Sequence, residues 1–329
     1  MKLNTGLNPY GLTWHLGLQG KGTARANPKP GGLEGFIAIA TELNAKVLEI
    51  FDPWLAESSE DDLHALKLRL AKLGMTPVIS AGLNMMGPIE SALRSAKALD
   101  AKIIRLGLSP VLEGSRNAWG AKWFELQASI REGLAKYAAM AADNGVSFAI
   151  ENHQDFTAQE LVGFCEEFGP SVGITFDTGN AFPVCAAPLD FARTVGPYVK
   201  HLHLKDYRVQ FTDEGYRLVR CAIGDGAVPF KAIVEILGRS HTTMNAVLEP
   251  GALDARHIQF LHPQWWHGYA PQAAANLAAA LAAAHVNRLD DNADCRTPWE
   301  RGADAEVEAY ELDMIRRSAA NMRALGLMN

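Results

Sequence analysis

Short apolar runs alternate with longer amphipathic segments along most of this chain. Runs rich in β-branched and aromatic residues, bounded by glycine, proline and polar clusters, predict eight strands. Their expected ranges are 10–16, 46–51, 76–81, 102–107, 146–152, 172–177, 198–205 and 245–249. Between them, apolar residues recur every three or four positions, as in the leucine stripe from Leu63 to Leu73 that follows Ser59. This spacing predicts helices.

Strand and helix patterns that alternate eight times predict an α/β fold, a (β/α)8 TIM barrel. The alternative is an open doubly wound sheet, but no GxGxxG sequence follows any predicted strand. We expect a single domain over residues 1–329. Within it, the barrel core is expected at about 10–285 and a C-terminal helical extension at about 286–329.

Residues 207–221 alternate apolar and polar side chains around a Thr-Asp-Glu-Gly turn, which predicts a β-hairpin inserted after the seventh strand. The hairpin carries Arg208, Arg217 and Arg220 and follows a strand that ends at the barrel mouth. We therefore expect a lid over the mouth. Its arginines are either a solvated face or contacts to an anionic substrate.

Four of the predicted strands end on residues that bind metals in proteins. The strand ends read FAIEN, GITFDTGN, KHLHLKD and AVLEPG, and they supply Glu151, Asp177, His203 and Glu249. The first two intervals are 26 residues each, about one strand–helix unit, and the longer third interval contains the hairpin. Because side chains alternate along a strand, the large apolar neighbours face the helices and these four face the interior. The C-terminal ends of barrel strands meet at one mouth, so we expect one metal site there.

Two glutamates, one aspartate and one histidine make an oxygen-rich donor set with a single imidazole. Such a set favours one divalent ion, Mn²⁺ first, with Mg²⁺, Co²⁺ and Zn²⁺ as alternatives. A divalent ion can hold adjacent oxygens of a hydroxy-ketone and stabilise the enediolate that forms when a neighbouring bond breaks. The alternative interpretation is that the four residues are ordinary inward polar groups satisfied by hydrogen bonds.

The same segments resemble the sugar phosphate isomerase/epimerase group of xylose-isomerase-like TIM barrels over roughly residues 10–285. The resemblance rests on IENH, DTGN, HLHLKD, the Ile-Gly-Asp-Gly of 223–226, and LEPG. It implies that Glu151, Asp177, His203 and Glu249 bind one divalent metal. It further implies that the two glutamates are catalytic, as an acid/base pair on opposite faces of a small carbohydrate substrate.

Members of this group include ketose 3-epimerases, hydroxypyruvate isomerase, inosose dehydratase and decarboxylases of 3-oxo sugar acids. The resemblance therefore predicts the fold of this chain well but predicts its substrate poorly. Ketose 3-epimerases usually carry a histidine three residues after the aspartate ligand, and this chain has Asn180 there. That difference weakens the assignment as a ketose epimerase and leaves the metal site unaffected.

Lys205 lies two residues beyond His203 on the same strand face. We expect it to be a catalytic group that protonates or polarises a carbonyl oxygen of the substrate. The alternative is a structural salt bridge with Asp206 or Asp225.

Six further residues are candidates for binding the substrate: Glu49, Arg105, His153, Asn180, His15 and Trp265. Glu49 could instead pair with a neighbouring histidine, and Arg105 could clamp an anionic group or neutralise a glutamate. His153 directly follows a ligand segment and could support the ligands instead. His15 is a hydroxyl contact or a core residue. Trp265 would stack on a sugar ring or make a subunit contact.

The composition limits the classes of partner that the protein can have, but it adds little about the fold. The 329 residues carry a net charge of −6, which argues against nucleic-acid binding. No basic and apolar leader opens the chain, and the longest apolar run, residues 273–284, is too short to span a bilayer. Four scattered cysteines without a CxxC pair argue against a zinc knuckle or a disulfide framework. We therefore expect a cytoplasmic enzyme without nucleic-acid or membrane partners, and leave a homo-oligomer open.

These residues lead us to expect a metal-dependent isomerase or epimerase that acts on a small keto-sugar or sugar derivative through an enediolate. The alternative is a metal-dependent lyase, either a dehydratase or a decarboxylase of a 3-oxo sugar acid, because loss of CO₂ gives the same enediolate. A weaker alternative is a DNA repair enzyme of the apurinic-endonuclease kind. Those enzymes share the barrel but need a trinuclear zinc site, and the acidic net charge argues against them.

Overall fold

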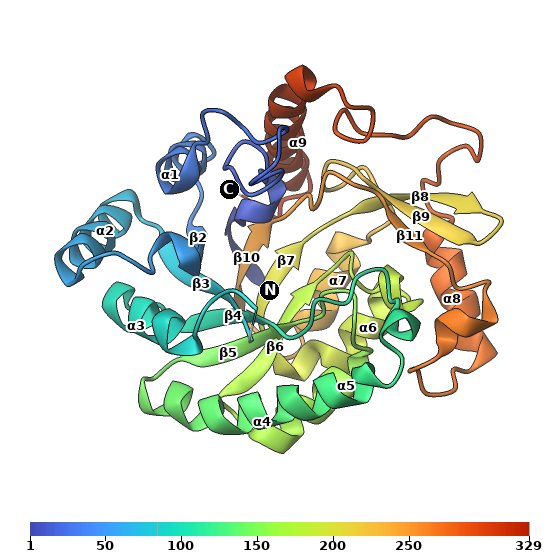
Figure 1. Ribbon diagram of the computed structural model, residues 1–329, viewed down its shortest axis with the longest axis horizontal. Coiled ribbons are helices and arrows are strands. Elements are labelled where there is room, and N and C mark those ends of the chain that lie inside the picture. Colours follow the sequence, from blue (N-terminus) through green and yellow to red (C-terminus); the bar gives the residue numbers. More distant parts are fainter. Residues whose placement is uncertain (84, 329) are drawn as a thin grey trace.

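Parallel strands close into a barrel in the computed structural model, which describes residues 1–83 and 85–328 (Figure 1). The barrel strands are β1 (Lys2–Leu7), β2 (Val47–Phe51), β3 (Thr76–Gly82), β4 (Ile103–Gly107), β5 (Ser147–Glu151), β6 (Val172–Asp177), β7 (Val199–Leu204) and β10 (Thr243–Leu248). Their order around the ring is β1-β10-β7-β6-β5-β4-β3-β2. The predicted (β/α)8 fold is confirmed. Asn329, the last residue of the predicted extension, lies outside the described residues.

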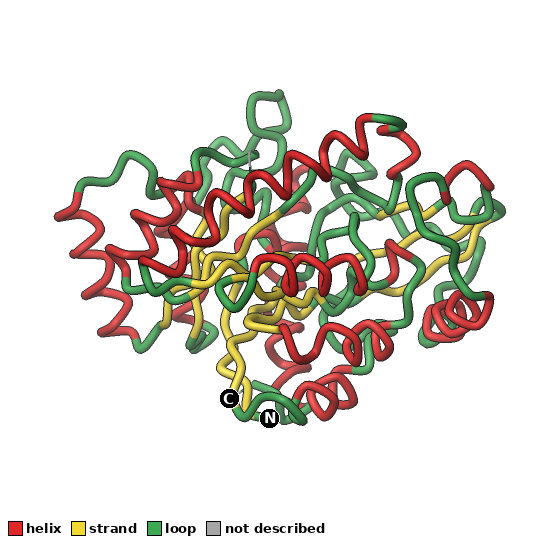
Figure 2. Tube along the Cα trace, turned by 90° about the horizontal axis from the view of Figure 1, so that it is seen from below, coloured by secondary structure: helices red, strands yellow, loops and turns green. Residues whose placement is uncertain are grey.

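Helices surround the barrel strands, as the red and yellow segments of Figure 2 show. The helices are α1 (Gly32–Glu42), α2 (Glu60–Leu73), α3 (Ile89–Leu99), α4 (Lys122–Asp143), α5 (Ala158–Phe168), α6 (Pro188–Val195), α7 (Phe230–Leu237), α8 (Ala274–Ala284) and α9 (Asp304–Ala324). Short 3₁₀ turns are η1 (Pro9–Gly11), η2 (Asp52–Trp54), η3 (Arg116–Trp119), η4 (Phe182–Val184), η5 (Gly196–Tyr198) and η6 (Pro263–Trp266). Ser59 and Thr157 cap α2 and α5 through complete capping boxes, so both helices begin where the sequence predicts.

The first strand begins eight residues earlier than predicted, at Lys2 rather than at residue 10. β1 pairs with β10 along its whole length and with β2 at Gly6 and Leu7. The chain then turns at η1, where the Asn8 side chain accepts a hydrogen bond from the Tyr10 N–H at 2.7 Å. An Asn-Pro pair favours such a turn. The predicted barrel boundary at residue 10 was therefore wrong, and the barrel begins near residue 2.

Strand register brings the ends of four strands to one mouth. Asp177 lies directly opposite His203 across the β6–β7 pair. Glu151 lies opposite Thr175 across the β5–β6 pair, two residues before Asp177. Glu249 follows β10, and its backbone N–H donates to the Leu204 carbonyl at 3.0 Å. Because all these strands are parallel, their carboxyl ends share the same side of the barrel.

The predicted hairpin is confirmed as β8 (Tyr207–Thr212) and β9 (Gly215–Arg220), which form a three-stranded sheet with β11 (Arg256–Ile258). In Figure 1 this sheet extends to the right, away from the barrel strands. Arg208 and Arg220 donate to backbone carbonyls, and Arg217 pairs with Glu300 at 3.2 Å. These three arginines are therefore held by contacts outside the mouth, while Tyr207 at the start of the hairpin lines the cavity beside the barrel mouth. That the hairpin is a lid stays a prediction.

The C-terminal helix α9 packs on the N-terminal segment. Glu311 on α9 is fully buried. Its carboxylate accepts hydrogen bonds from the Trp14 N–H at 3.1 Å and from the His15 N–H at 2.8 Å. The extension therefore stabilises the loop after β1.

Two further observations concern the described residues as a set. None of their helices combines the length and the apolar character that crossing a membrane requires. The cysteines are all free thiols, and Cys165, Cys185 and Cys221 are buried.

Candidate metal centre

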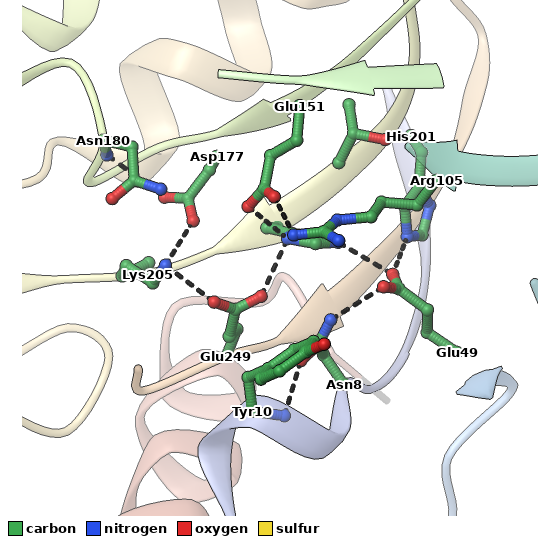
Figure 3. A network of polar contacts seen from close by, with 12 residues as sticks. Asn8, Tyr10, Glu49, Arg105, Glu151, Asp177, Asn180, His201, Lys205 and Glu249 are labelled. Atoms are coloured by element: carbon green, nitrogen blue, oxygen red, sulfur yellow. Dashed lines mark hydrogen bonds and ion pairs between the residues drawn. The ribbon is translucent and has the colours of Figure 1, made fainter. Parts of the chain in front are cut away.

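The structure brings the four predicted ligands together at the mouth. Glu151 ends β5, Asp177 ends β6, His203 lies in β7 and Glu249 follows β10. One ligand atom from each lies within 4.8 Å of the other three, and all four side chains are buried. Figure 3 shows their carboxylates converging from separate strands. That this cluster binds a metal stays a prediction.

Both nitrogens of the His203 ring face carboxylates. Nε2 lies 2.7 Å from Glu49 Oε2, while Nδ1 lies 3.1 Å from Glu151 Oε1 and 2.8 Å from Glu249 Oε2. A metal-binding histidine typically donates its other N–H to a carboxylate, which sets the tautomer and the ring orientation. Nδ1 is therefore the nitrogen that faces the predicted metal, and Glu49 orients the ring.

Glu49 was predicted either to contact the substrate or to pair with a neighbouring histidine, and the structure confirms the pairing. Its side chain is fully buried beneath the cluster and does not line the cavity. Oε2 also lies 3.0 Å from His201 Nε2, and Oε1 accepts a hydrogen bond from Asn8 Nδ2 at 2.8 Å. A contact of Glu49 with the substrate stays a prediction.

Two cations hold the other carboxylates (Figure 3). Arg105 forms an ion pair with Glu151. Lys205 Nζ lies 2.6 Å from Asp177 Oδ2 and 2.6 Å from Glu249 Oε1. Lys205 thus bridges two predicted ligands directly beside the site.

The predicted alternative for Lys205, a salt bridge with Asp206 or Asp225, is wrong. Asp206 points into a loop and accepts hydrogen bonds from the backbone N–H groups of Gly224, Gly226 and Val228 at 2.8–3.0 Å. A Cβ added at Gly226 would lie 2.3 Å from Asp206 Oδ1, so this position requires glycine. The Ile-Gly-Asp-Gly motif therefore builds the loop after β9 and does not contact the site.

Burial and neighbouring charges shift the pKa values of the cluster. Burial raises the pKa of Asp177 to about 7, and the Lys205 ammonium opposes that rise. Burial by itself lowers the pKa of His203, but the surrounding glutamates raise it well above its usual value. Among the described groups, the carboxylates of Glu49, Glu151, Asp177 and Glu249 face the permanent cations of Arg105 and Lys205, and protonated His203 adds a third positive charge. A divalent cation at His203 Nδ1 would replace that proton and be balanced by the same carboxylates.

The donor set fits a divalent cation. Glu249 Oε2 is buried and accepts no hydrogen bond from any described residue, although His203 Nδ1 is 2.8 Å away. A buried carboxylate oxygen without a donor is costly. A cation between Glu249, His203 and Glu151 would satisfy it. Oxygen donors with one imidazole suit Mn²⁺ and, with different geometry, Mg²⁺, Co²⁺ or Zn²⁺.

A cavity of about 380 Å³ lies against the cluster and includes Lys205 and Glu249 in its wall. Arg105 and His153, both predicted to contact the substrate, also line it. Burial lowers the pKa of His153 to about 4, so its imidazole is neutral near pH 7. It can therefore donate or accept a hydrogen bond from the wall.

The residues of the cavity wall that the sequence did not identify include Tyr10, Tyr207 and Arg256. Tyr10 begins the segment 10–16, which the sequence wrongly predicts as the first strand. Tyr207 is identified from the sequence only as the first residue of the hairpin. Arg256 lies on a three-residue strand that has no recognisable pattern. Tyr207 could have been identified from its spacing, because it lies two residues after Lys205 at the end of a ligand-bearing strand.

The remaining predicted substrate contacts lie in three different places. Asn180 is buried beside Asp177, and its side-chain amide has no hydrogen-bond partner among the described residues. His15 lies away from the cavity, with Nδ1 2.8 Å from Glu308 Oε1 on α9, because it follows a turn rather than a strand. Trp265 is buried against Tyr269, with ring centroids 4.9 Å apart, and donates to the Glu113 carbonyl. The structure therefore shows other partners for His15 and Trp265, and their contacts with a substrate stay predictions.

Comparison with known sequences gives a family and one partial relative. The family described as xylose isomerase-like TIM barrel matches residues 37–252. A segment of 93 residues is 32% identical to the uncharacterized protein YihM of Escherichia coli (strain K12). That match spans 28% of this chain and 28% of the relative, well short of the relative's full length.

Solved structures of similar architecture share little sequence with this chain. A D-psicose 3-epimerase from Clostridium cellulolyticum H10, solved with D-tagatose, is 18% identical with a TM-score of 0.58 over 100% of both chains. A D-tagatose 3-epimerase-like protein is 19% identical with a TM-score of 0.53, over 67% of this chain and 87% of its own. The probable 3-DHS dehydratase AsbF of Bacillus anthracis is 13% identical with a TM-score of 0.54, over 75% and 92%. At these identities the likeness supports the fold alone.

Proposed function

The chain belongs to the xylose isomerase-like TIM barrel family, and on that premise we propose that it is a divalent-metal-dependent isomerase or epimerase. Its substrate is a small keto-sugar or sugar derivative, converted through an enediolate intermediate. One observation carries the proposal. Glu151 and Glu249 meet in one buried cluster beside a cavity, and a different cation holds each of them.

Glu249 supports the role of a proton-transfer base. It lines the cavity, with Oε2 toward His203 Nδ1 at 2.8 Å and Oε1 toward Lys205 Nζ at 2.6 Å. Burial raises its pKa, but the Lys205 ammonium and His203 together hold the pKa below the ordinary value. The carboxylate is therefore ionised near pH 7, as a group that takes a proton from a carbon next to a carbonyl must be.

Glu151 supports the role of the second proton-transfer group. It lies on the other side of His203 Nδ1, which is 3.1 Å from Glu151 Oε1 and 2.8 Å from Glu249 Oε2. Despite its burial, Arg105 holds the pKa of Glu151 well below the ordinary value. Two ionisable carboxylates that reach one substrate from different strands can remove a proton on one face and return it on the other.

Lys205 is suited to bind an oxygen of the substrate rather than to act as a base. Burial lowers its pKa, but Asp177 and Glu249 raise it well above its usual value, so the ammonium stays charged. It lines the cavity and can donate a hydrogen bond to a substrate oxygen that becomes negative during the reaction. A divalent ion at the four ligands, Mn²⁺ first, would supply further stabilisation of that negative charge when bound.

A lyase acting on a sugar acid is the second candidate. Asn180 occupies the position where ketose 3-epimerases usually have a histidine, and its amide is buried without a partner among the described residues. A change at this position alters the groups available to the substrate beside Asp177. It favours a related reaction on the same scaffold, dehydration or decarboxylation of a 3-oxo sugar acid.

Two measurements test the proposal. Elemental analysis should find about one divalent ion per chain, and His203→Ala should lose most of it. Keto-sugars and 3-oxo acids incubated with Mn²⁺ in deuterated water should yield a product with solvent deuterium next to the carbonyl. The Glu249→Gln variant should lose this exchange, while Glu308→Gln, at an exposed glutamate of α9, should keep it. Full activity of metal-free protein, or a product without solvent deuterium, would contradict the proposal.

A further inference from the structure

β11 carries an arginine on the inward face of the hairpin sheet. It pairs antiparallel with β9, so that Arg256 lies opposite Leu218 and Ile258 lies opposite Tyr216. Leu218, Tyr216 and Ile258 are fully buried. Because residues directly opposite each other share a face, Arg256 lies on the side of the sheet that faces the interior.

The Arg256 guanidinium lines the cavity and makes no ion pair or hydrogen bond with any described residue. In contrast, Arg105 in the same wall is neutralised by Glu151. Asp254 also lines the cavity; burial raises its pKa and the nearby Arg256 charge opposes that rise, but the two side chains form no ion pair in the described part of the chain. Arg256 is half-buried, so its guanidinium is free to pair with an anionic ligand that enters the cavity.

Tyr207 relates this arginine to the predicted metal centre. Burial raises the pKa of the Tyr207 phenol to about 12, while both Lys205 and Arg256 lower it. The phenol therefore lies within electrostatic range of the cluster on one side and of Arg256 on the other. Tyr207 also lines the cavity, and its hydroxyl makes no hydrogen bond with the described residues.

We propose that Arg256 and the Tyr207 hydroxyl bind an anionic group on the substrate, at the end remote from the metal centre. The substrate is then a keto-sugar acid or a sugar phosphate rather than a neutral sugar. A guanidinium fork matches the paired oxygens of either a carboxylate or a phosphate. A cavity of about 380 Å³ is within the range that holds small ligands. This inference rests on the proposed function, because the metal centre defines where the carbonyl end lies.

Calorimetric titration of the Mn²⁺-loaded protein tests the inference with three ligands of matched length. D-fructose is neutral, D-fructuronate carries a terminal carboxylate, and D-fructose 6-phosphate carries a terminal phosphate. At least one anionic ligand should bind about tenfold more tightly than D-fructose, since a hydrogen bond to a charged group is worth at least that factor. The ligand that binds more tightly shows whether the charged group of the substrate is a carboxylate or a phosphate.

Three variants separate this site from other anion contacts. Arg256→Met should abolish the preference for the anion, and Asp254→Asn should increase it, because it removes a competing negative charge. Arg208→Met is the matched control, since Arg208 lies on the same sheet and donates to the Asn287 carbonyl outside the cavity. It should bind like the wild type.

An anion preference that survives in Arg256→Met would mean that the anion binds the metal or another cation, and would overturn the inference. Equal or undetectable binding of all three ligands would overturn it too. These outcomes leave the proposed function separately testable, because metal content and the His203→Ala variant do not depend on Arg256. Arg256→Met should therefore retain its metal.

Discussion

At His203, one ring nitrogen faces Glu49 and the other faces Glu151 and Glu249. Glu49→Gln keeps the shape of the side chain but removes the negative charge that orients the ring. Metal affinity should therefore fall about 10- to 100-fold, as for other carboxylates behind metal-binding histidines. Titration with Mn²⁺ measures this, with Glu308→Gln as the control. An unchanged affinity in Glu49→Gln would contradict an orienting role.

Also at the residue scale, Asp155 should make the stability of the folded protein depend on pH. It is fully buried, and its Oδ2 accepts a hydrogen bond from Ser109 at 2.6 Å. Burial raises its pKa from 3.8 to about 7. Because the folded protein holds this proton more tightly than the unfolded chain, the contribution to stability is full below pH 3.8. It is lost as the pH rises through about 7.

Asp155→Asn cannot ionise, so it should gain stability relative to the wild type as the pH rises from about 4 to about 8. Urea denaturation at several pH values measures the difference. Asp61→Asn, at an exposed position on α2, is the control and should show no such trend. A difference that stays constant with pH would contradict the shift at Asp155.

At the scale of elements, we expect the hairpin sheet to be a fixed support rather than a moving cover. β8 and β9 pair from Tyr207–Arg220 to Thr212–Gly215, and β11 adds a third strand. Hydrogen exchange of the β8 and β9 amides should therefore be slow without substrate and should change little when substrate binds. A lid would behave otherwise, with fast exchange that slows on binding. That outcome would support the lid hypothesis.

At the scale of the whole molecule, the metal should stabilise the fold. The cluster joins residues of β5, β6, β7 and the end of β10, so a bound ion would hold these elements together. A ligand that binds only the folded state adds about 2.7 kcal/mol when its concentration is 100-fold above Kd. Removing the metal with a chelator should therefore lower Tm by several degrees, and Mn²⁺ should restore it. His203→Ala should show a smaller shift than the wild type.

Much of the fold could be predicted because its determinants are local. Alternating strand and helix patterns predict the barrel, and the capping residues Ser59 and Thr157 predict two helix starts that the structure confirms. The first strand could not be predicted this way. β1 has few large apolar residues, and its pairing with β10 joins segments more than 200 residues apart in sequence.

The sequence by itself determined the ligand-type residues at four strand ends, because strand periodicity and the parallel order of a barrel suffice to bring them to one mouth. Only the tertiary structure decided the partners of Glu49 and Lys205 and the place of Arg256. Glu49 is satisfied by imidazoles from β7, and Lys205 by carboxylates from two other strands. Arg256 reaches the cavity through a short strand added to the hairpin. Such partners depend on side-chain packing between distant segments, and no local pattern encodes it.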